Sequence, residues 1–426
     1  MLKKTYEGMD LDLYYEKLDN GLDVYIVPMP QFTNIYATFT TKFGSIHSGF
    51  KFANEKNYTT VSDGIAHFLE HKMFENADGV DPFTFFGKSG TDTNANTSFY
   101  RTSYLFKGRE NFDNNLNYLL DFVQTPYLTK ENVLKEKGII TEEAKMYLDH
   151  PYWRLVETAL RNTFINNPLG IPVIGTIDSI NKITKEELMY CYKAFYHPSN
   201  MIAVISGPVN QGDVLKVIKD NQSKKDYQMM PEIEIKPFDE PNQVALAFEE
   251  VRLDVAVPKA IINYKINYDL LNLDLKKVNF YLQDFLAMKF GETSVFNNYL
   301  IDQKSIIGSL ETEIILSEKH LVMSIMLESE TPESIIELVK KEMLDLSFDP
   351  ADLERKKKVS LAHLIAANEN IEKPNERIFE SIVLFGDLIL NIKELLTSLN
   401  ADELNEMLNK IDFTNSNVVI VKPINE

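Results

Sequence analysis

Two histidines four residues apart are the strongest chemical feature of this 426-residue sequence. His67 and His71 lie in a segment, 61–76, whose apolar spacing predicts a helix. Positions i and i+4 of a helix share one face, so both imidazoles can bind a single zinc ion. Glu70 lies on the same face and is placed to take a proton from a water molecule. Ser62 or Asp63 is expected to cap the start of this helix.

The alternative explanation is that two of the seven histidines fall four apart by chance. The glutamate between them weighs against chance, because H-x-x-E-H is the inverted zinc-peptidase motif. A hydrolytic zinc site has three protein ligands and an open fourth position, so one more ligand is needed. Glu136 and Glu143 lie two turns apart on a predicted helix, 130–148, although their spacing alone equally fits a charged, solvated helix face.

The elements around these residues predict an α+β first half. Leu22–Val27 and Asn34–Thr40 have the pattern of two strands joined by a turn, which predicts an opening β-hairpin or meander. An alternating run at 91–106 and the apolar segment Met201–Gly207 predict further strands. Helices are expected at 61–76, 111–122, 130–148, 152–166 and 184–196.

The second half repeats this order of elements. A polar, proline-bearing stretch at 221–243 predicts a linker. After it, strands are expected at 243–248, 260–266 and 417–421, and helices at about 274–290 and 331–345. We therefore expect two homologous αβ domains, an N-terminal metal-binding domain at 1–220 and a C-terminal domain without the metal motif at 244–426.

Composition excludes several classes of function. The 63 acidic and 44 basic residues give a net charge of −19, which disfavours binding to nucleic acid or to anionic lipid. The first residues lack the apolar region of a signal peptide, and no apolar run is long enough for a membrane helix. The single cysteine, Cys191, favours a cytoplasmic location.

Five ordered motifs make the sequence similar to the pitrilysin/insulysin family of zinc peptidases. It is closest to the small bacterial members that resemble the mitochondrial processing peptidase β-subunit. The similarity is colinear over residues 20–210 and fades to the level of the fold afterwards. The motifs are His67-x-x-Glu70-His71, Asn94–Ser98, Glu136–Glu143, Leu169–Thr176 and Phe195–Met201.

The resemblance implies a role for each residue of the metal site. His67 and His71 match the histidine ligands, and Glu143 matches the glutamate ligand. Glu70 matches the general base. Glu136 matches a glutamate of the catalytic machinery that lies below the metal and orients a ligating side chain.

The resemblance also implies a substrate-binding strand. Asn94, Ala95, Asn96 and Thr97 match the edge strand on which these enzymes pair the backbone of the substrate. Without the zinc helix, the same run would be interpreted as an ordinary edge strand rich in Thr and Asn.

Family members have two homologous halves per chain, each a sheet with helices on one side, and two such units close like a clamshell around a peptide. The half without metal supplies an arginine and a tyrosine to the substrate carbonyl. In this chain those positions fall on Ile301 and Ile307, which cannot donate hydrogen bonds through their side chains. The sequence therefore predicts a heterodimer with a homologous partner that lacks the zinc motif, with a homodimer as the second possibility.

The resulting hypothesis is a zinc-dependent endopeptidase subunit that hydrolyses short, unstructured peptides, and the acidic surface suggests tolerance for cationic ones. The competing hypothesis is a catalytically silent subunit of the same fold that binds peptides or serves as a scaffold. Silent members usually lose motif residues, whereas His67, Glu70, His71 and Glu143 are all present.

Overall fold

The computed structural model describes residues 1–7, 11–228 and 230–424. Its contacts divide the chain into two compact units that interleave along the sequence. Unit 1 comprises Met1–Ala144, Ile171–Pro237 and Ala366–Asn391, and unit 2 comprises Lys145–Gly170, Phe238–Ile365 and Ile392–Glu426. The homologous halves 1–220 and 244–426 remain a prediction, because units defined by contacts need not have the same boundaries as a repeat along the sequence.

Unit 1 is built on a seven-stranded sheet in the order β1-β2-β3-β9-β4-β8-β7. The fully buried strands β9 and β4 lie at its centre, and β7 is one edge. The strands are β1 (Leu2–Tyr6), β2 (Leu11–Lys17), β3 (Asp23–Pro28), β4 (Ile35–Thr41), β7 (Asp92–Thr97), β8 (Thr102–Gly108) and β9 (Met201–Gly207).

A second, three-stranded sheet and a set of helices complete unit 1. The small sheet contains β5 (Gly49–Phe52), β6 (Thr59–Thr60) and β10 (Ile233–Ile235). The helices are α1 (Ile65–Met73), α2 (Pro82–Gly87), α3 (Phe112–Val123), α4 (Lys130–Asp149, whose last residues fall in unit 2), α6 (Ile177–Lys182), α7 (Lys185–Phe195), α8 (Gln211–Gln222) and α13 (Lys373–Phe385).

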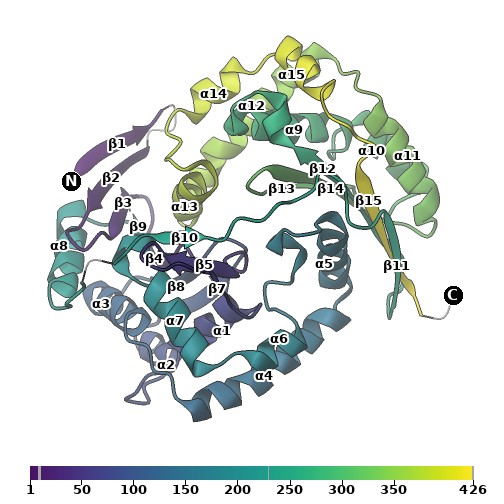
Figure 1. Cartoon of the computed structure of the whole chain (residues 1–426). Coiled ribbons are helices and arrows are strands. Elements are labelled where there is room, and N and C mark those ends of the chain that lie inside the picture. Colours follow the sequence, from purple (N-terminus) through teal and green to yellow (C-terminus); the bar gives the residue numbers. More distant parts are fainter. Residues whose placement is uncertain (8–10, 229, 425–426) are drawn as a thin grey trace. The chain divides into compact units, whose positions relative to one another are not determined.

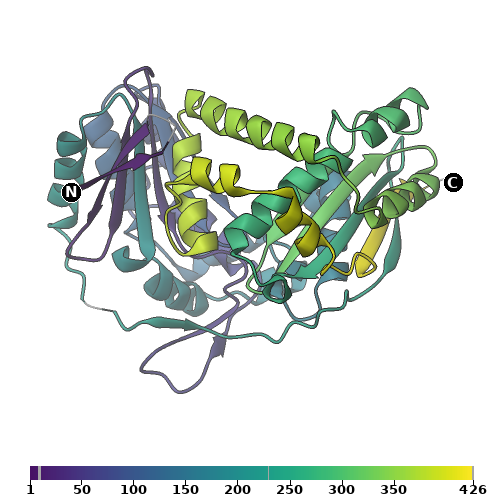
Figure 2. The same cartoon turned by 90° about the horizontal axis from the view of Figure 1, so that it is seen from above.

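Unit 2 is built on a five-stranded sheet in the order β11-β15-β12-β14-β13. In Figure 2 its strands run from teal and green to yellow, the colour of β15 near the C-terminus. Its strands are β11 (Phe248–Leu253), β12 (Lys259–Asn267), β13 (Glu311–Leu316), β14 (His320–Glu328) and β15 (Ser416–Pro423). Its helices are α5 (Pro151–Thr163), α9 (Leu275–Lys289), α10 (Val295–Asp302), α11 (Pro332–Leu344), α12 (Pro350–Ala366), α14 (Ile392–Ser398) and α15 (Ala401–Leu408).

The two sheets share one topology. In unit 1, β3 pairs parallel with β9, and β9-β4-β8-β7 continue antiparallel. In unit 2, β11 pairs parallel with β15, and β15-β12-β14-β13 continue antiparallel. The α+β class and the repeated sheet-and-helix organisation expected from the sequence are thereby confirmed.

The structure adds a helix to the second face of each sheet, taken from the other half of the sequence. On the unit 1 sheet, α1 and α3 contact one face and α13 contacts the other (Figure 1), where Asn375 Nδ2 donates to Val204 O at 2.9 Å. On the unit 2 sheet, α5 packs through Leu155 and Ala159. There Asn417 Nδ2 donates to Thr163 Oγ1 at 2.6 Å, so a buried polar bond fixes each added helix.

Two predictions about strands differ from the structure. Strands β3 and β4 do not form a hairpin, because β9 lies between them and pairs with both. The strand expected at 243–248 begins only at Phe248. The stretch 221–243, expected as a linker, contains β10, which pairs with β5 and thereby satisfies its backbone groups.

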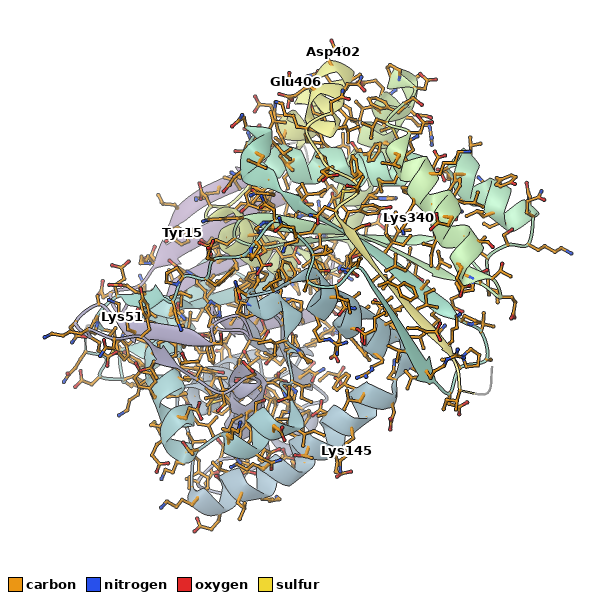
Figure 3. The ribbon with its side chains drawn as sticks, turned by 45° about the vertical axis from the view of Figure 1, so that its right-hand side comes forward. Tyr15, Lys51, Lys145, Lys340, Asp402 and Glu406 are labelled. Carbon is orange, nitrogen blue, oxygen red and sulfur yellow. The ribbon has the colours of Figure 1, made fainter. Side chains whose placement is uncertain are left out.

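Charged side chains mostly project from the surface of each unit. Asp402 and Glu406, one turn apart on α15, point away from the helix into solvent (Figure 3). Among the residues that the structure describes, no helix combines the length and the apolar character needed to cross a bilayer.

A buried ion pair anchors the end of α5 in unit 2. The side chains of Lys265 and Glu240 are 0% and 2% exposed, and their charged groups are in contact. Lys265 also donates to the carbonyl oxygens of Pro241 and Gln243 at 2.6 and 2.9 Å. Glu240 accepts from the backbone N–H groups of residues 165–167, directly after α5.

We predict that Lys265→Met lowers the free energy of unfolding by about 3–5 kcal/mol, because it leaves the Glu240 carboxylate buried without its counter-ion. The measurement is urea denaturation followed by circular dichroism. The control is Lys259→Met, which breaks an ion pair with Glu328 whose side chains are 24% and 43% exposed. That change is expected to cost less than about 1 kcal/mol, and an equal loss in both variants would contradict the prediction.

Candidate metal centre

Helix α1 presents the two histidines because its other side is apolar. Ile65, Phe68, Leu69 and Met73 are buried, and the helix contacts β7, β8 and α7. His67 is only 8% exposed, at the edge of this buried side. The sequence prediction of a helix through His67 and His71 is confirmed.

The start of α1 differs from the prediction. The N-cap is Gly64, with φ of 85°, and not Ser62 or Asp63. A Cβ at Gly64 would lie 2.2 Å from the carbonyl oxygen of Ile174, so only glycine allows this close approach. The Ser62 hydroxyl instead donates to Glu187 of α7 at 3.2 Å. The segment that contains Ile174 thus affects the position of the two histidines indirectly, because it packs against the first turn of α1.

Three side chains from α1 and α4 converge on one point. The ligating atoms of His67, His71 and Glu143 all lie within 4.8 Å of one another. His67 Nε2 is 3.6 Å from Glu143 Oε1, and His71 Nε2 is 3.4 Å from Glu143 Oε2. The structure therefore brings together the three residues that the sequence analysis combined into a ligand set.

Glu136, which lies two turns before Glu143 on α4, holds the imidazole of His71. Its Oε1 lies 3.0 Å from His71 Nδ1, and a carboxylate can only accept, so the imidazole donates. This bond directs the Nε2 lone pair of His71 towards Glu143. It is the arrangement by which outer carboxylates orient metal-binding histidines.

A buried lysine that the sequence analysis missed supports Glu136. Lys72 is 0% exposed, and its Nζ lies 3.6 Å from Glu136 Oε2 and 2.7 Å from Glu75 Oε2. Its positive charge stabilises the carboxylate that orients His71. A lysine directly after a histidine ligand, on a helix that is otherwise buried, was the available signal.

The protonation states follow from burial and from these contacts. Burial lowers the pKa of His67 to about 3, so its imidazole is neutral at neutral pH. Burial opposes charge on His71 as well, but Glu136, Glu143 and Glu70 raise its pKa overall. Burial opposes ionisation of Glu136, and its hydrogen bond with His71 and the nearby Lys72 nevertheless lower its pKa.

This donor set fits zinc. Two imidazoles and one carboxylate are borderline and hard donors of the kind found in catalytic zinc sites, which keep a fourth position open. His67 is neutral, so no imidazolium proton has to be displaced by a metal, and Glu136 fixes the other imidazole. In the described part of the chain, the buried Nδ1 of His67 has no hydrogen-bond partner, so no hydrogen bond at that atom fixes the orientation of the ring.

Glu70 lies beside this cluster and is held by the edge strand. The Thr97 hydroxyl donates to Glu70 Oε2 at 2.5 Å. Burial raises the pKa of Glu70, and the bond from Thr97 lowers it part of the way. A carboxylate with a raised pKa, close to the metal-binding atoms, has the properties of a general base.

The predicted substrate strand is β7, at the edge of the unit 1 sheet. Asn94 and Asn96 are exposed, and Ala95 and Thr97 are half-buried. The Ala95 N–H donates to the Asn94 side chain at 2.9 Å, a bond that a pairing peptide would have to displace. Ile301 and Ile307 lie in unit 2, 39% and 51% exposed, and bring no side-chain donor.

Comparison with known proteins identifies the class to which this fold and site belong. A family model described as Insulinase (Peptidase family M16) matches residues 45–177, and one described as Peptidase M16 inactive domain matches residues 182–360. The chain belongs to peptidase family M16. Homologues of this family are named zinc proteases.

Individual relatives resemble the chain over its whole length. A Bacillus subtilis protein named Uncharacterized zinc protease YmfH is 36% identical over 95% of this chain and 94% of its own. A crystal structure of an M16-like peptidase from Alicyclobacillus acidocaldarius superposes with a TM-score of 0.91 at 29% identity, over 98% of this chain and 100% of the other. The periplasmic protease PqqL from Escherichia coli has the same fold, with a TM-score of 0.75 at 19% identity, and 99% of this chain covers 48% of it.

We predict that Glu136→Gln weakens zinc binding about 10- to 100-fold, because the amide can turn its NH2 towards His71 and no longer fixes the histidine tautomer. Lys72→Met is expected to weaken it to a smaller extent through the same bond. Zinc affinity is measured by competition with a chromogenic chelator.

The matched control is Lys130→Gln, which removes an exposed lysine of α4. Its zinc affinity is expected to equal that of the unmodified protein. Unchanged affinity in Glu136→Gln would show that the contact with His71 does not orient a ligand.

Proposed function

We propose that this chain is the catalytic subunit of a zinc-dependent endopeptidase that hydrolyses short, unstructured peptides. One observation carries the proposal. The ligating atoms of His67, His71 and Glu143 lie within 4.8 Å of one another, and Glu70, which is bonded to Thr97, lies beside them without being one of the three. The named zinc proteases among its relatives support the same chemistry.

Each residue has a defined task in this reaction. His67, His71 and Glu143 would hold zinc, which supplies a Lewis acid that acidifies water and polarises a carbonyl group. Glu70 takes the proton of the attacking water and passes it to the departing amine. Thr97 keeps the Glu70 carboxylate in place through its hydroxyl. Glu136 and Lys72 hold His71 in the tautomer that leaves Nε2 free.

The substrate class follows from the strand that lies beside Glu70. Because β7 is an edge strand, an extended peptide can add to it through backbone hydrogen bonds. Asn94, Ala95, Asn96 and Thr97 form this binding strand in the proposal. Backbone pairing selects an extended conformation more than a sequence, which favours peptides without stable structure.

The subunit role rests on the missing donors. Ile301 and Ile307 occupy the positions where an arginine and a tyrosine are expected, so a homologous partner without the zinc motif is proposed to supply them. The twofold length of PqqL, of which this chain covers 48%, supports an assembly of two such chains. A homodimer is the alternative, and a cytoplasmic location stays a prediction from the lone cysteine.

A catalytically silent subunit is the competing proposal. It would retain the fold and bind peptides without hydrolysis. The presence of His67, Glu70, His71 and Glu143 in one cluster with Glu136 argues against it, because a silent subunit has no use for a complete set.

We predict that Glu70→Gln retains zinc but loses at least about 10²-fold in kcat, because the amide cannot take a proton. Glu143→Gln is expected to lose both activity and zinc, because it replaces a ligand with a weaker one. Zinc content after dialysis is measured by elemental analysis, and cleavage is measured with a mixture of unstructured peptides. Equal loss of zinc in both variants would contradict the separation of base and ligand.

We predict that the isolated, zinc-loaded chain is a poor peptidase and that a partner raises kcat/KM by about 10²-fold or more, the effect of restoring a donor to the developing oxyanion. Turnover is assayed while light scattering measures the mass at the same concentration. Full turnover by a monomer would refute the partner requirement. Turnover by a homodimer would show that the donors come from a second copy.

A further inference from the structure

A small polar cavity of about 50 Å³ lies in unit 1, between the sheet and α13. Strands β4, β7 and β8 form its floor, and Asn375, Glu376 and Phe379 of α13 form its wall. Asn96 of the proposed substrate strand and Arg101 also line it. None of these residues has a role in the metal centre.

The cavity lies on the face of the sheet opposite Glu70. Thr97 points to Glu70 and also contacts the Thr102 hydroxyl at 3.2 Å, so both residues face the metal side. Neighbouring side chains of a strand alternate between faces, which places Asn96 and Arg101 on the other side. A peptide that adds to β7 would alternate in the same way, and every second side chain would face Asn96 and Arg101.

Arg101 brings a positively charged side chain to the lining of this cavity. Its guanidinium lies 5.0 Å from the centre of the Phe379 ring, a cation–π contact that holds the side chain against α13. Among the described residues, no carboxylate lies within ion-pair distance of Arg101, although Glu380 of α13 is near enough to be influenced by its charge. The other charges around it are paired: Glu376 with Lys373 at 2.6 Å and Lys107 with Glu372 at 2.8 Å.

A second observation marks the cavity as a place for a hydrogen-bonding group. Asn375 is 3% exposed, and its Nδ2 donates to Val204 O at 2.9 Å, which fixes the direction of the amide. Its Oδ1 is buried without a hydrogen bond. A buried acceptor that faces no donor calls for a water molecule or a polar ligand in the adjoining space.

We propose that this cavity is a substrate subsite in which Arg101 binds an acidic side chain of the peptide, at a position close to the scissile bond and turned away from the metal. The inference rests on the proposed pairing of substrate with β7 and adds a preference to it. A carboxylate fits the planar donors of the Arg101 guanidinium group. A water molecule that donates one hydrogen bond to Asn375 Oδ1 and one to the carboxylate would join these two acceptors.

The test is an aspartate scan of an unstructured peptide, with an Asn peptide matched to every Asp peptide. Binding is measured by fluorescence anisotropy to the zinc-loaded Glu70→Gln protein, in the complex with its partner where that is the active form. At one position next to the cleavage site, the Asp peptide is expected to bind about tenfold more tightly, which corresponds to a charge-assisted hydrogen bond that is partly exposed to solvent.

Two variants of Arg101 test its part. Arg101→Gln is expected to abolish the difference between the Asp and Asn peptides, and Arg101→Glu is expected to favour a Lys peptide instead. The matched control is Lys107→Gln, which removes a cation from β8, the strand that Arg101 directly precedes. Because Lys107 is already paired with Glu372, the preference for Asp is expected to persist.

Equal binding of the Asp and Asn peptides at every position would overturn the subsite, and so would an undiminished preference in Arg101→Gln. Mapping cleavage by the protein with Glu70 intact separates this result from the proposed function. Cleavage without acid preference refutes only the subsite. Acid-selective binding that depends on Arg101, without cleavage of any peptide, refutes only the peptidase.

Discussion

The hydrogen bond between His71 and Glu136 is the contact on which the rest of the site depends. It fixes one imidazole so that its free nitrogen meets Glu143, and it requires α1 and α4 to lie side by side. Gly64, at the start of α1, permits the close approach of the Ile174 carbonyl group. The buried ammonium group of Lys72 stabilises the carboxylate of Glu136. The apolar side of α1 and the position of α4 thus both serve to place His71 opposite Glu143.

The sequence predicted most of the metal centre because its residues follow helical periodicity. His67, Glu70 and His71 share one short helix, and Glu136 and Glu143 share another, so local spacing determined each group. The family resemblance joined the two groups. Lys72 was missed because its place directly after His71 is a weak local signal, and the carboxylate that it lies beside comes from α4, more than sixty residues along the chain.

Long-range pairings in the fold were harder to predict. The insertion of β9 between β3 and β4 joins residues far apart in the sequence, and no turn signal marks a parallel pairing. The strand β10 is too short to show a periodicity of its own. The start of α1 at Gly64 depends on Ile174, about a hundred residues away, and the hydroxyl of Ser62 bonds to Glu187 instead of capping the helix.

The exchange of α5 and α13 between the halves of the sequence has a consequence for biosynthesis. The sheet that carries the metal-binding helices is finished only when residues 371–375 dock on Val204 and Ser206, close to the end of translation. When the first 220 residues have emerged from the ribosome, all seven strands of this sheet have been made, but the face that α13 covers is still open. The packing of the metal-binding unit is therefore complete only after residues 371–375 have been synthesised.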